Sequence, residues 1–329
     1  MGPSSWRTRD HSLRCAIRLV CKLLPDPRLV CLDRPHFRAA RPIKVILDTD
    51  IGTDIDDAWA LGFVMSSPEF ELMAVTITDG NTTARARVAC KLLQTSDHGA
   101  VPVAVGRPTP PPEGVDYQFA WAEDFTAKRP VVQPAAQLIV DTARRFPNEV
   151  TLVAVGPLQN VADALRLEPR LPTLLKRVVL MSGSIRGSAW NPAPVPEWNV
   201  VRATADAQLV YAAGFPLTTV PLDSTSYVQL KDEERERLRG RATPLTRSLE
   251  TLYRLWLDNP ARRMTLHDQL AVAETARPAE FFGRCDTLRL RVDDQGFTRI
   301  DEAKGVPVTV CFEPKRDAFM RYYLEGLTR

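Results

Sequence analysis

Short apolar runs recur along the chain from residue 43 onward, and each is followed by a polar turn and a stretch of helical periodicity. Runs of this kind are typical of buried strands. They occupy residues 44–47, 72–78, 101–105, 150–155, 178–181 and 217–221. The periodic stretches predict helices at residues 56–66, from 81 through 93, and at 135–146, 158–167, 206–213, 228–239, 245–257 and 317–324.

Strands that alternate with helices predict an α/β fold, here a Rossmann-like, mostly parallel sheet with helices on both faces. Residues 288–312 alternate as hairpin strands do, so we expect a mixed sheet. Two long loops are predicted at 107–134 and 182–199. Ligands bind such sheets beyond the carboxyl ends of the strands, and the polar clusters of this chain follow apolar strands.

The first 42 residues differ from the rest in charge. They carry nine Lys/Arg against three Asp, a net charge of +6, whereas the whole chain has +3, which leaves −3 for the remainder. Pro25, Pro27 and Pro35 also argue against a single long helix in this segment. The sequence predicts a basic, poorly ordered extension (1–42) before a catalytic domain (43–329), and the main domain's charge does not indicate nucleic-acid binding.

The cysteines and the hydropathy of the chain bear on the cellular location of the protein. The chain has six cysteines, none of them in a CxxC pair. This spacing indicates neither a disulfide framework nor a zinc site, so we expect a reducing, cytoplasmic location. No apolar run is long enough to span a bilayer. The Arg-rich extension is also compatible with a targeting segment, so that interpretation stays open.

Five aspartates crowd the end of the first predicted strand: Asp48, Asp50, Asp54, Asp56 and Asp57. Carboxylates repel one another, and each is costly to remove from water. Five of them at one strand end therefore predict a bound cation. Oxygen ligands without Cys or His suit a hard ion such as Ca²⁺ or Mg²⁺.

Other patterns come close to this cluster. An EF-hand loop from Asp48 would need Gly and Glu where the chain has Thr53 and Trp59, so that kind of calcium site is excluded. A strand followed by Asp48-x-Asp50 is also similar to haloacid-dehalogenase-type phosphatases, in which Asp48 would be the nucleophile. Helix capping accounts for one or two of the aspartates, but poorly for five.

Further motifs follow the aspartates in order. They are Asp79-Gly80-Asn81, residues 155–160, Asn191 with Glu197-Trp198-Asn199, and His267-Asp268. Together with residues 48–61 they resemble the inosine–uridine-preferring nucleoside hydrolase family, from about residue 43 to the C-terminus. The chain departs from the family pattern by a two-residue insertion that includes Asp54, by Gln269 in place of Pro, and by the lack of His in the loop at 117–125.

The resemblance implies roles for the matching positions. It implies Ca²⁺ ligands at Asp50, Asp57, Asp268 and the main-chain carbonyl of Val155. It implies ribose contacts at Asp56, Asn81, Asn191, Glu197 and Asn199. Asp50 would also be the general base for the attacking water, His267 would lie near the leaving base, and Asp48 would support the loop from behind.

The reaction that the resemblance implies is hydrolysis of the N-glycosidic bond of a ribonucleoside to free base and ribose by a calcium-bound water. Positive charge then develops on the ribose, and a carboxylate-rich pocket stabilises it. Two alternatives stay open: a related fold that binds a ribosyl ligand with little turnover, and the metal-dependent phosphatase. The resemblance to this family also implies a homodimer or homotetramer that serves nucleoside catabolism or salvage.

Aromatic side chains are the candidates for stacking on the base, because the expected loop His is missing. They are Tyr117, Trp121, Tyr253 and Trp256. For Tyr253 and Trp256 a helix that packs its aromatic stripe into the core explains the pattern equally well.

Overall fold

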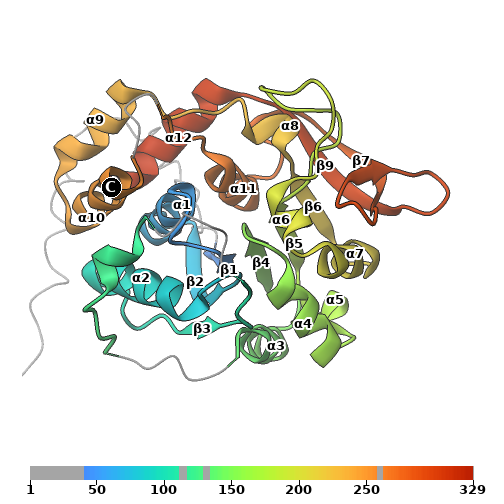
Figure 1. The fold of residues 1–329 in the computed structure, drawn as a ribbon, viewed down its shortest axis with the longest axis horizontal. Helices are drawn as coiled ribbons and strands as arrows, with labels where there is room; N and C mark the ends of the chain where they lie inside the picture. Colours follow the sequence, from blue (N-terminus) through green and yellow to red (C-terminus); the bar gives the residue numbers. More distant parts are fainter. Residues whose placement is uncertain (1–40, 111–116, 129–133, 258–261, 329) are drawn as a thin grey trace, which may run out of the picture. The chain divides into compact units, whose positions relative to one another are not determined.

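The predicted mixed, mostly parallel sheet is confirmed. The computed structural model describes residues 41–110, 117–128, 134–257 and 262–328 (Figure 1). Its strands are β1 (Ile43–Thr49), β2 (Phe70–Ile77), β3 (Val103–Val105), β4 (Val150–Ala154), β5 (Arg177–Met181), β6 (Leu217–Val220), β7 (Phe282–Val292), β8 (Thr298–Ile300) and β9 (Val306–Pro314). Among the described residues they form one sheet in the order β3-β2-β1-β4-β5-β6-β9-β7-β8. Neighbours from β3 to β9 are parallel, and β7 runs antiparallel to β9 and β8.

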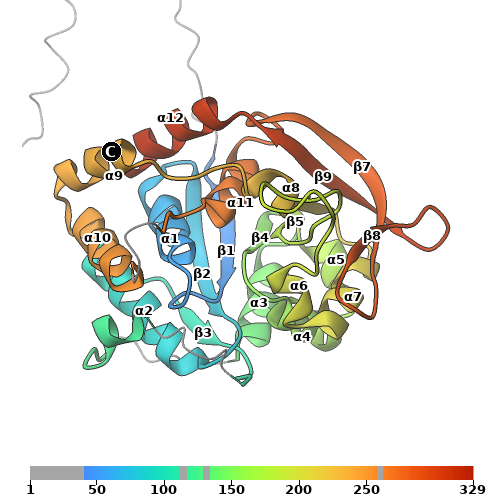
Figure 2. The same cartoon turned by 45° about the horizontal axis from the view of Figure 1, so that its top comes forward.

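Helices cover both faces of this sheet. They are α1 (Asp56–Ser66), α2 (Thr82–Thr95), η1 (Phe119–Ala122), α3 (Ala135–Arg145), α4 (Gln159–Leu167), α5 (Leu171–Leu174), α6 (Trp198–Val201), α7 (Thr204–Ala212), α8 (Leu222–Thr225), α9 (Asp232–Arg241), α10 (Pro244–Trp256), α11 (His267–Ala276) and α12 (Arg316–Leu327). Figures 1 and 2 show α1, α11 and α12 on one side of the strands and α3, α4 and α7 on the other.

Alternate residues of the central strands enter two separate cores. In β1, Val45 and Leu47 pack in the core that contains α1 and α11, whereas Ile46 packs in the core that contains α3 and α4. Successive side chains of a strand point to opposite faces, and burial of each stabilises the fold by about 1.5–3 kcal/mol. Because both faces are covered, the strands are continuous apolar runs, which is why the sequence pattern located them.

The sheet has its switch point between β1 and β4. β1 pairs with β2 on one side and with β4 on the other, all parallel. The chain thus winds outward from β1 in both directions, and the loops after β1 and β4 separate at their carboxyl ends. Open α/β sheets bind ligands in this crevice.

A disulfide in the C-terminal hairpin corrects the expectation that none would form. Cys285 of β7 lies opposite Cys311 of β9, with Cα atoms 4.0 Å apart, and the two are bonded. The register of two strands brings them together, and cysteine spacing alone does not reveal that register. The bond removes the cysteine-based reason for expecting a reducing compartment.

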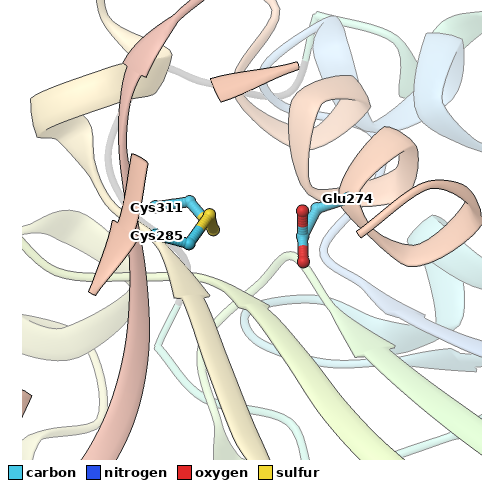
Figure 3. Close-up of side chains that lie close together, drawn as sticks. All are labelled: Glu274, Cys285 and Cys311. Atoms are coloured by element: carbon cyan, nitrogen blue, oxygen red, sulfur yellow. A yellow bond between two sulfur atoms is a disulfide. The ribbon is translucent and has the colours of Figure 1, made fainter. Parts of the chain in front are cut away.

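Glu274 of α11 lies beside the two sulfurs (Figure 3). The group is a poor metal site, because the sulfurs are bonded to each other. The Glu274 carboxylate also has partners already: it accepts a hydrogen bond from Ala279 N at 2.7 Å and lies 3.6 Å from Arg177 Nη1.

The predicted extension (1–42) lies outside the described residues except for its last two positions, as do parts of the loop 107–134. Within the described ranges, no helix combines the length and apolar character needed to cross a membrane.

Candidate active site

A cavity of about 340 Å³ opens at the carboxyl ends of β1, β4 and β5. Its wall combines carboxylates, aromatic rings and a few amide or apolar groups. The lining residues are Asp50, Thr53, Asp54, Asp56, Asp57, Tyr117, Val155, Met181, Trp190, Glu197, Trp198, Asn199, Leu222, Arg262, His267 and Asp268. Residues from six separate segments therefore meet at the switch point.

Three buried carboxylates form the tightest group in this wall. An oxygen from each of Asp56, Asp57 and Asp268 lies within 4.8 Å of the others. Asp56 and Asp57 begin α1, and Asp268 lies in the first turn of α11. Helix N-termini carry positive partial charge, which favours carboxylates there. Asp57 also accepts a hydrogen bond from Thr49 Oγ1 at 2.5 Å.

Burial raises the pKa of Asp56, Asp57 and Asp268 well above the usual range, and repulsion between neighbouring carboxylates raises the pKa further. A cation bound between them would offset both effects. These acidic groups could therefore hold a metal ion.

Asp50 lies in the same wall, outside that tight group. Burial raises the pKa of its carboxyl to about 6, whereas Arg85 opposes this shift. Arg85 Nη2 lies 4.0 Å from Asp50 Oδ2, and only 1% of the Arg85 side chain is exposed. Arg85 was not predicted as a site residue, because the sequence around it gives no signal of a buried arginine.

Asp48 lies behind the pocket and does not line it. Its side chain is fully buried, and Oδ1 accepts hydrogen bonds from Thr76 Oγ1 at 2.6 Å and from Asn160 Nδ2 at 2.7 Å. Burial raises the pKa of Asp48 to about 7. These contacts join β1 to β2 and α4. They suit the predicted role of Asp48, which is to support the loop after β1 without contacting a ligand.

Glu197 and Asn199 enter the pocket from the start of α6. Glu197 is its N-cap and accepts hydrogen bonds from Gly183 N at 3.0 Å and Asn199 N at 2.9 Å. Burial raises the pKa of Glu197 to about 7. Asn199 Nδ2 donates to the carbonyls of Val155 at 2.7 Å and Met181 at 3.0 Å. Its Oδ1 is therefore the group that remains to accept a hydrogen bond from a ligand.

His267 begins α11 and lines the cavity. Its Nδ1 lies 2.7 Å from Thr225 Oγ1, and its ring meets Trp190 edge-on with centroids 6.1 Å apart. Burial lowers the pKa of His267 to about 4, so the imidazole is neutral at pH 7.

Gln269, which replaces a proline of the family pattern, links the two helices that carry the acidic group. Its Nε2 donates to the Asp56 carbonyl at 2.7 Å, and it is fully buried. A proline could not make this contact, because it has no side-chain donor.

The rim of the pocket carries residues that the sequence analysis missed. Trp190 is 59% exposed and Trp198 is 49% exposed. Arg262 also lines the pocket and lies over the ring of Tyr117, with 5.4 Å between the guanidinium carbon and the ring centroid. Asp54, the extra carboxylate of the insertion, also lines the pocket. Its enclosure there raises the pKa of the carboxyl, whereas the hydrogen bond from Ile55 N and the charge of Arg262 oppose this.

Besides Asp48, five of the predicted site residues lie away from the lining. Asn81 is an exposed N-cap of α2 that accepts from Ala84 N at 3.1 Å. Asn191 accepts from Ala193 N at 3.0 Å. Trp121 packs under Lys91 instead.

Tyr253 and Trp256 are each 2% exposed and pack together in the core, with ring centroids 5.6 Å apart. The core-packing explanation of their spacing therefore holds for this structure. Tyr117 is the one stacking candidate of the sequence analysis that lines the pocket in the described residues.

Known proteins are similar to this chain in sequence and in fold. The family model described as inosine-uridine preferring nucleoside hydrolase matches residues 45–321. The pyrimidine-specific ribonucleoside hydrolase RihA of Shewanella sp. (strain ANA-3) is 29% identical over 315 residues, which cover 88% of this chain and 96% of that one. Uridine nucleosidase 1 of Arabidopsis thaliana is 27% identical over 270 residues, covering 77% and 79%. A solved plant nucleoside hydrolase, the PpNRh1 enzyme, has the same fold, with a TM-score of 0.77 at 24% identity over 87% of this chain and 99% of its own.

Proposed function

Because the chain belongs to the inosine–uridine preferring nucleoside hydrolase family, whose named relatives are ribonucleoside hydrolases, we propose that it cleaves the N-glycosidic bond of ribonucleosides with a water activated by Ca²⁺. One observation carries the proposal. The acidic group of Asp56, Asp57 and Asp268 shares a single pocket with Glu197 and Asn199. The proposed cation site and the proposed sugar-binding groups are therefore adjacent.

The proposed ligands of the ion are Asp50, Asp57, Asp268 and the Val155 carbonyl. All four line the pocket and offer oxygen only, the donor set that hard cations prefer. The Val155 oxygen accepts from Asn199 at 2.7 Å, and a carbonyl keeps a second lone pair for an ion. When bound, Ca²⁺ would acidify and orient the attacking water.

The remaining groups act on the sugar and the water. We assign Asp50 as the base that takes the proton of the water. Asp56, Glu197 and Asn199 would accept hydrogen bonds from the ribose hydroxyls. A pocket that pairs each hydroxyl discriminates strongly against a sugar that lacks one, because its partner would stay buried and unsatisfied. The same carboxylates stabilise the positive charge that develops on the ribose.

For the base we propose a preference for pyrimidines, with uridine the best substrate. The names of the relatives from Shewanella and Arabidopsis support this. The rim supports it chemically: Arg262 offers only donors, which match the carbonyl oxygens of uracil, and Tyr117, Trp190 and Trp198 offer aromatic surface for stacking.

The phosphatase alternative is disfavoured by the position of Asp48. Its carboxylate would be the nucleophile, yet it is fully buried, accepts two hydrogen bonds through Oδ1 and does not line the cavity. The phosphatase alternative requires that the protein release phosphate from a phosphomonoester and that Asp48→Asn abolish this release. The binding-only alternative requires affinity for ribose with no free base appearing over hours.

The test is a panel of uridine, cytidine, inosine and 2′-deoxyuridine, assayed for reducing sugar with and without chelator. We expect uridine to react fastest, 2′-deoxyuridine to react at least about 100-fold more slowly, and chelation to stop turnover until Ca²⁺ is restored. Asp50→Asn should lower kcat by at least about 100-fold, whereas Asp141→Asn, an exposed position on α3, should leave it unchanged. Full activity of Asp50→Asn would contradict the assignment.

We also propose a homodimer or homotetramer and a cytoplasmic role in nucleoside catabolism or salvage. The family resemblance supports these statements. Light scattering of the purified chain tests the first, because a monomeric mass would overturn it.

A further inference from the structure

We propose that Thr225 positions His267 so that the imidazole presents its Nε2 hydrogen to the departing base. The inference rests on the proposed function, in which His267 lies beside the leaving base. Thr225 is the last residue of α8 and His267 the first of α11, so the contact joins two helices that are distant in the sequence.

The tautomer follows from the surroundings of the hydroxyl. Thr225 is fully buried, and its Oγ1 lies 2.7 Å from His267 Nδ1. Among the residues that the structure describes, Oγ1 has no second hydrogen-bond partner. A buried hydroxyl hydrogen without an acceptor is destabilising, so the hydroxyl donates to Nδ1. A neutral imidazole whose Nδ1 accepts carries its hydrogen on Nε2.

The helix that carries Thr225 is itself held in place. Ser224 Oγ donates to the Cys311 carbonyl of β9 at 2.7 Å, and Thr225 N donates to the Pro221 carbonyl at 3.0 Å. The hydroxyl is therefore a fixed point against which the ring is oriented. Because His267 lines the cavity while Nδ1 is engaged with Thr225, Nε2 is the nitrogen available to a ligand.

This donor matters at the moment the glycosidic bond breaks. The bond between C1′ and the base nitrogen breaks, and the base keeps the electron pair. The water oxygen bonds to C1′, Asp50 takes a proton of that water, and the base gains a proton from solvent. A hydrogen bond from Nε2 stabilises the charge on the departing base, as a neutral donor can without losing its proton. Thr225 touches neither substrate nor ion and acts through His267.

Two substrates separate this role from a merely structural one. Uridine has a poor leaving group, whereas p-nitrophenyl β-D-ribofuranoside releases p-nitrophenolate, which needs no donor. We expect Thr225→Val to lower kcat for uridine by about 10–100-fold and to change kcat for the nitrophenyl riboside by less than about twofold. Thr225→Ser keeps the hydroxyl and should retain the activity. Thr142→Val makes the same kind of change at a buried threonine of α3, on the opposite face of the sheet, where Oγ1 donates to the Leu138 carbonyl at 2.7 Å; it should leave both activities unchanged.

His267→Ala should show the same dependence on the leaving group, and adding Thr225→Val to it should lower kcat no further. Equal losses on both substrates, or no loss on uridine, would overturn the inference. Should Thr225→Val fail to fold, ¹⁵N spectra of the wild-type protein, which has four histidines, decide it: a hydrogen on Nδ1 of His267 overturns the inference, and one on Nε2 supports it. Failure of the proposed function is distinct, because wild type would then cleave neither substrate.

Discussion

Arg85 puts a guanidinium directly behind the acidic pocket. Its Nε donates to the Asp79 carbonyl at 2.8 Å, and Nη1 donates to the Ile51 carbonyl at 3.2 Å. Its Nη2 lies 4.0 Å from Asp50 Oδ2 and 3.9 Å from Asp79 Oδ2. One side chain of α2 thus joins the loops that follow β1 and β2 and partly offsets the charge of Asp50.

Replacing Arg85 by Met keeps an apolar stem and removes the charge. We expect the free energy of unfolding of the metal-free protein to fall by about 3 kcal/mol, because Asp50 is left buried without its cation. Asp79 keeps Arg202, at 2.7 Å, which limits the loss. Urea unfolding measures the change. Arg87→Met, exposed on the same helix, is the control and should shift the value by less than about 0.5 kcal/mol. Equal stability of the two variants would contradict this account.

For single residues, the sequence predicted those features whose members are close together in the chain. The aspartates from Asp48 to Asp57 stand out because they lie within one short segment. Arg85 and Thr225 carry no such mark, since their key partners Ile51 and His267 lie 34 and 42 residues away. The exposed Trp190 and Trp198 could be predicted, because each adjoins a motif residue in a loop after a strand.

Among the elements, the meeting of α1 and α11 builds the site. Asp56 and Asp57 open one helix and Asp268 opens the other, so two positive helix ends face the same acidic group. Gln269 of α11 ties them together by donating to the Asp56 carbonyl at 2.7 Å. This amide therefore helps to fix the position of Asp268 relative to α1, in addition to the apolar packing of the two helices.

Removing that amide should loosen the ion site. We expect Gln269→Ala to weaken Ca²⁺ binding by about 10-fold, as loss of groups that orient ligands does. Calorimetric titration of the chelated protein measures the Kd. Gln137→Ala is the control, because Gln137 donates to Asp141 on α3, on the opposite face of the sheet. An unchanged Kd in Gln269→Ala would show that α11 holds Asp268 without the link.

The elements themselves were readable from the sequence, because strands buried on both faces are apolar throughout. Their tertiary pairing was not. That Asp57 and Asp268 would share one site was implied by the family resemblance alone. The facing of Cys285 and Cys311 depends on a register between β7 and β9 that no local pattern encodes.

Across the whole molecule, the pocket couples pH to stability. Burial raises the pKa of Asp48 and Glu197 to about 7 and that of Asp50 to about 6. In an unfolded chain these carboxyls titrate near pH 4. Between about pH 4 and 7 the folded metal-free protein therefore binds more protons than the unfolded chain, and its stability falls as the pH rises through this window. Glu168, whose pKa Arg144 lowers to about 2, acts in the opposite sense below that window. His267, whose pKa burial lowers to about 4, opposes the effect within the window, but it is one group against three carboxyls.

We therefore expect the Tm of the chelated protein to be several degrees lower at pH 8 than at pH 5. Ca²⁺ should reverse this, since it binds deprotonated carboxylates and competes with protons. At a concentration of 100 times its Kd, Ca²⁺ would raise the free energy of unfolding by about 2.7 kcal/mol at pH 8 and by much less at pH 5. Thermal unfolding at four pH values, with chelator or with Ca²⁺, measures both effects. Glu197→Gln is the matched variant: it removes a titrating carboxyl that is not a proposed ligand, so it should flatten the chelated profile and keep the Ca²⁺ gain. A chelated protein whose Tm climbs from pH 5 to pH 8 would show that the pocket carboxylates are not the groups that set its stability.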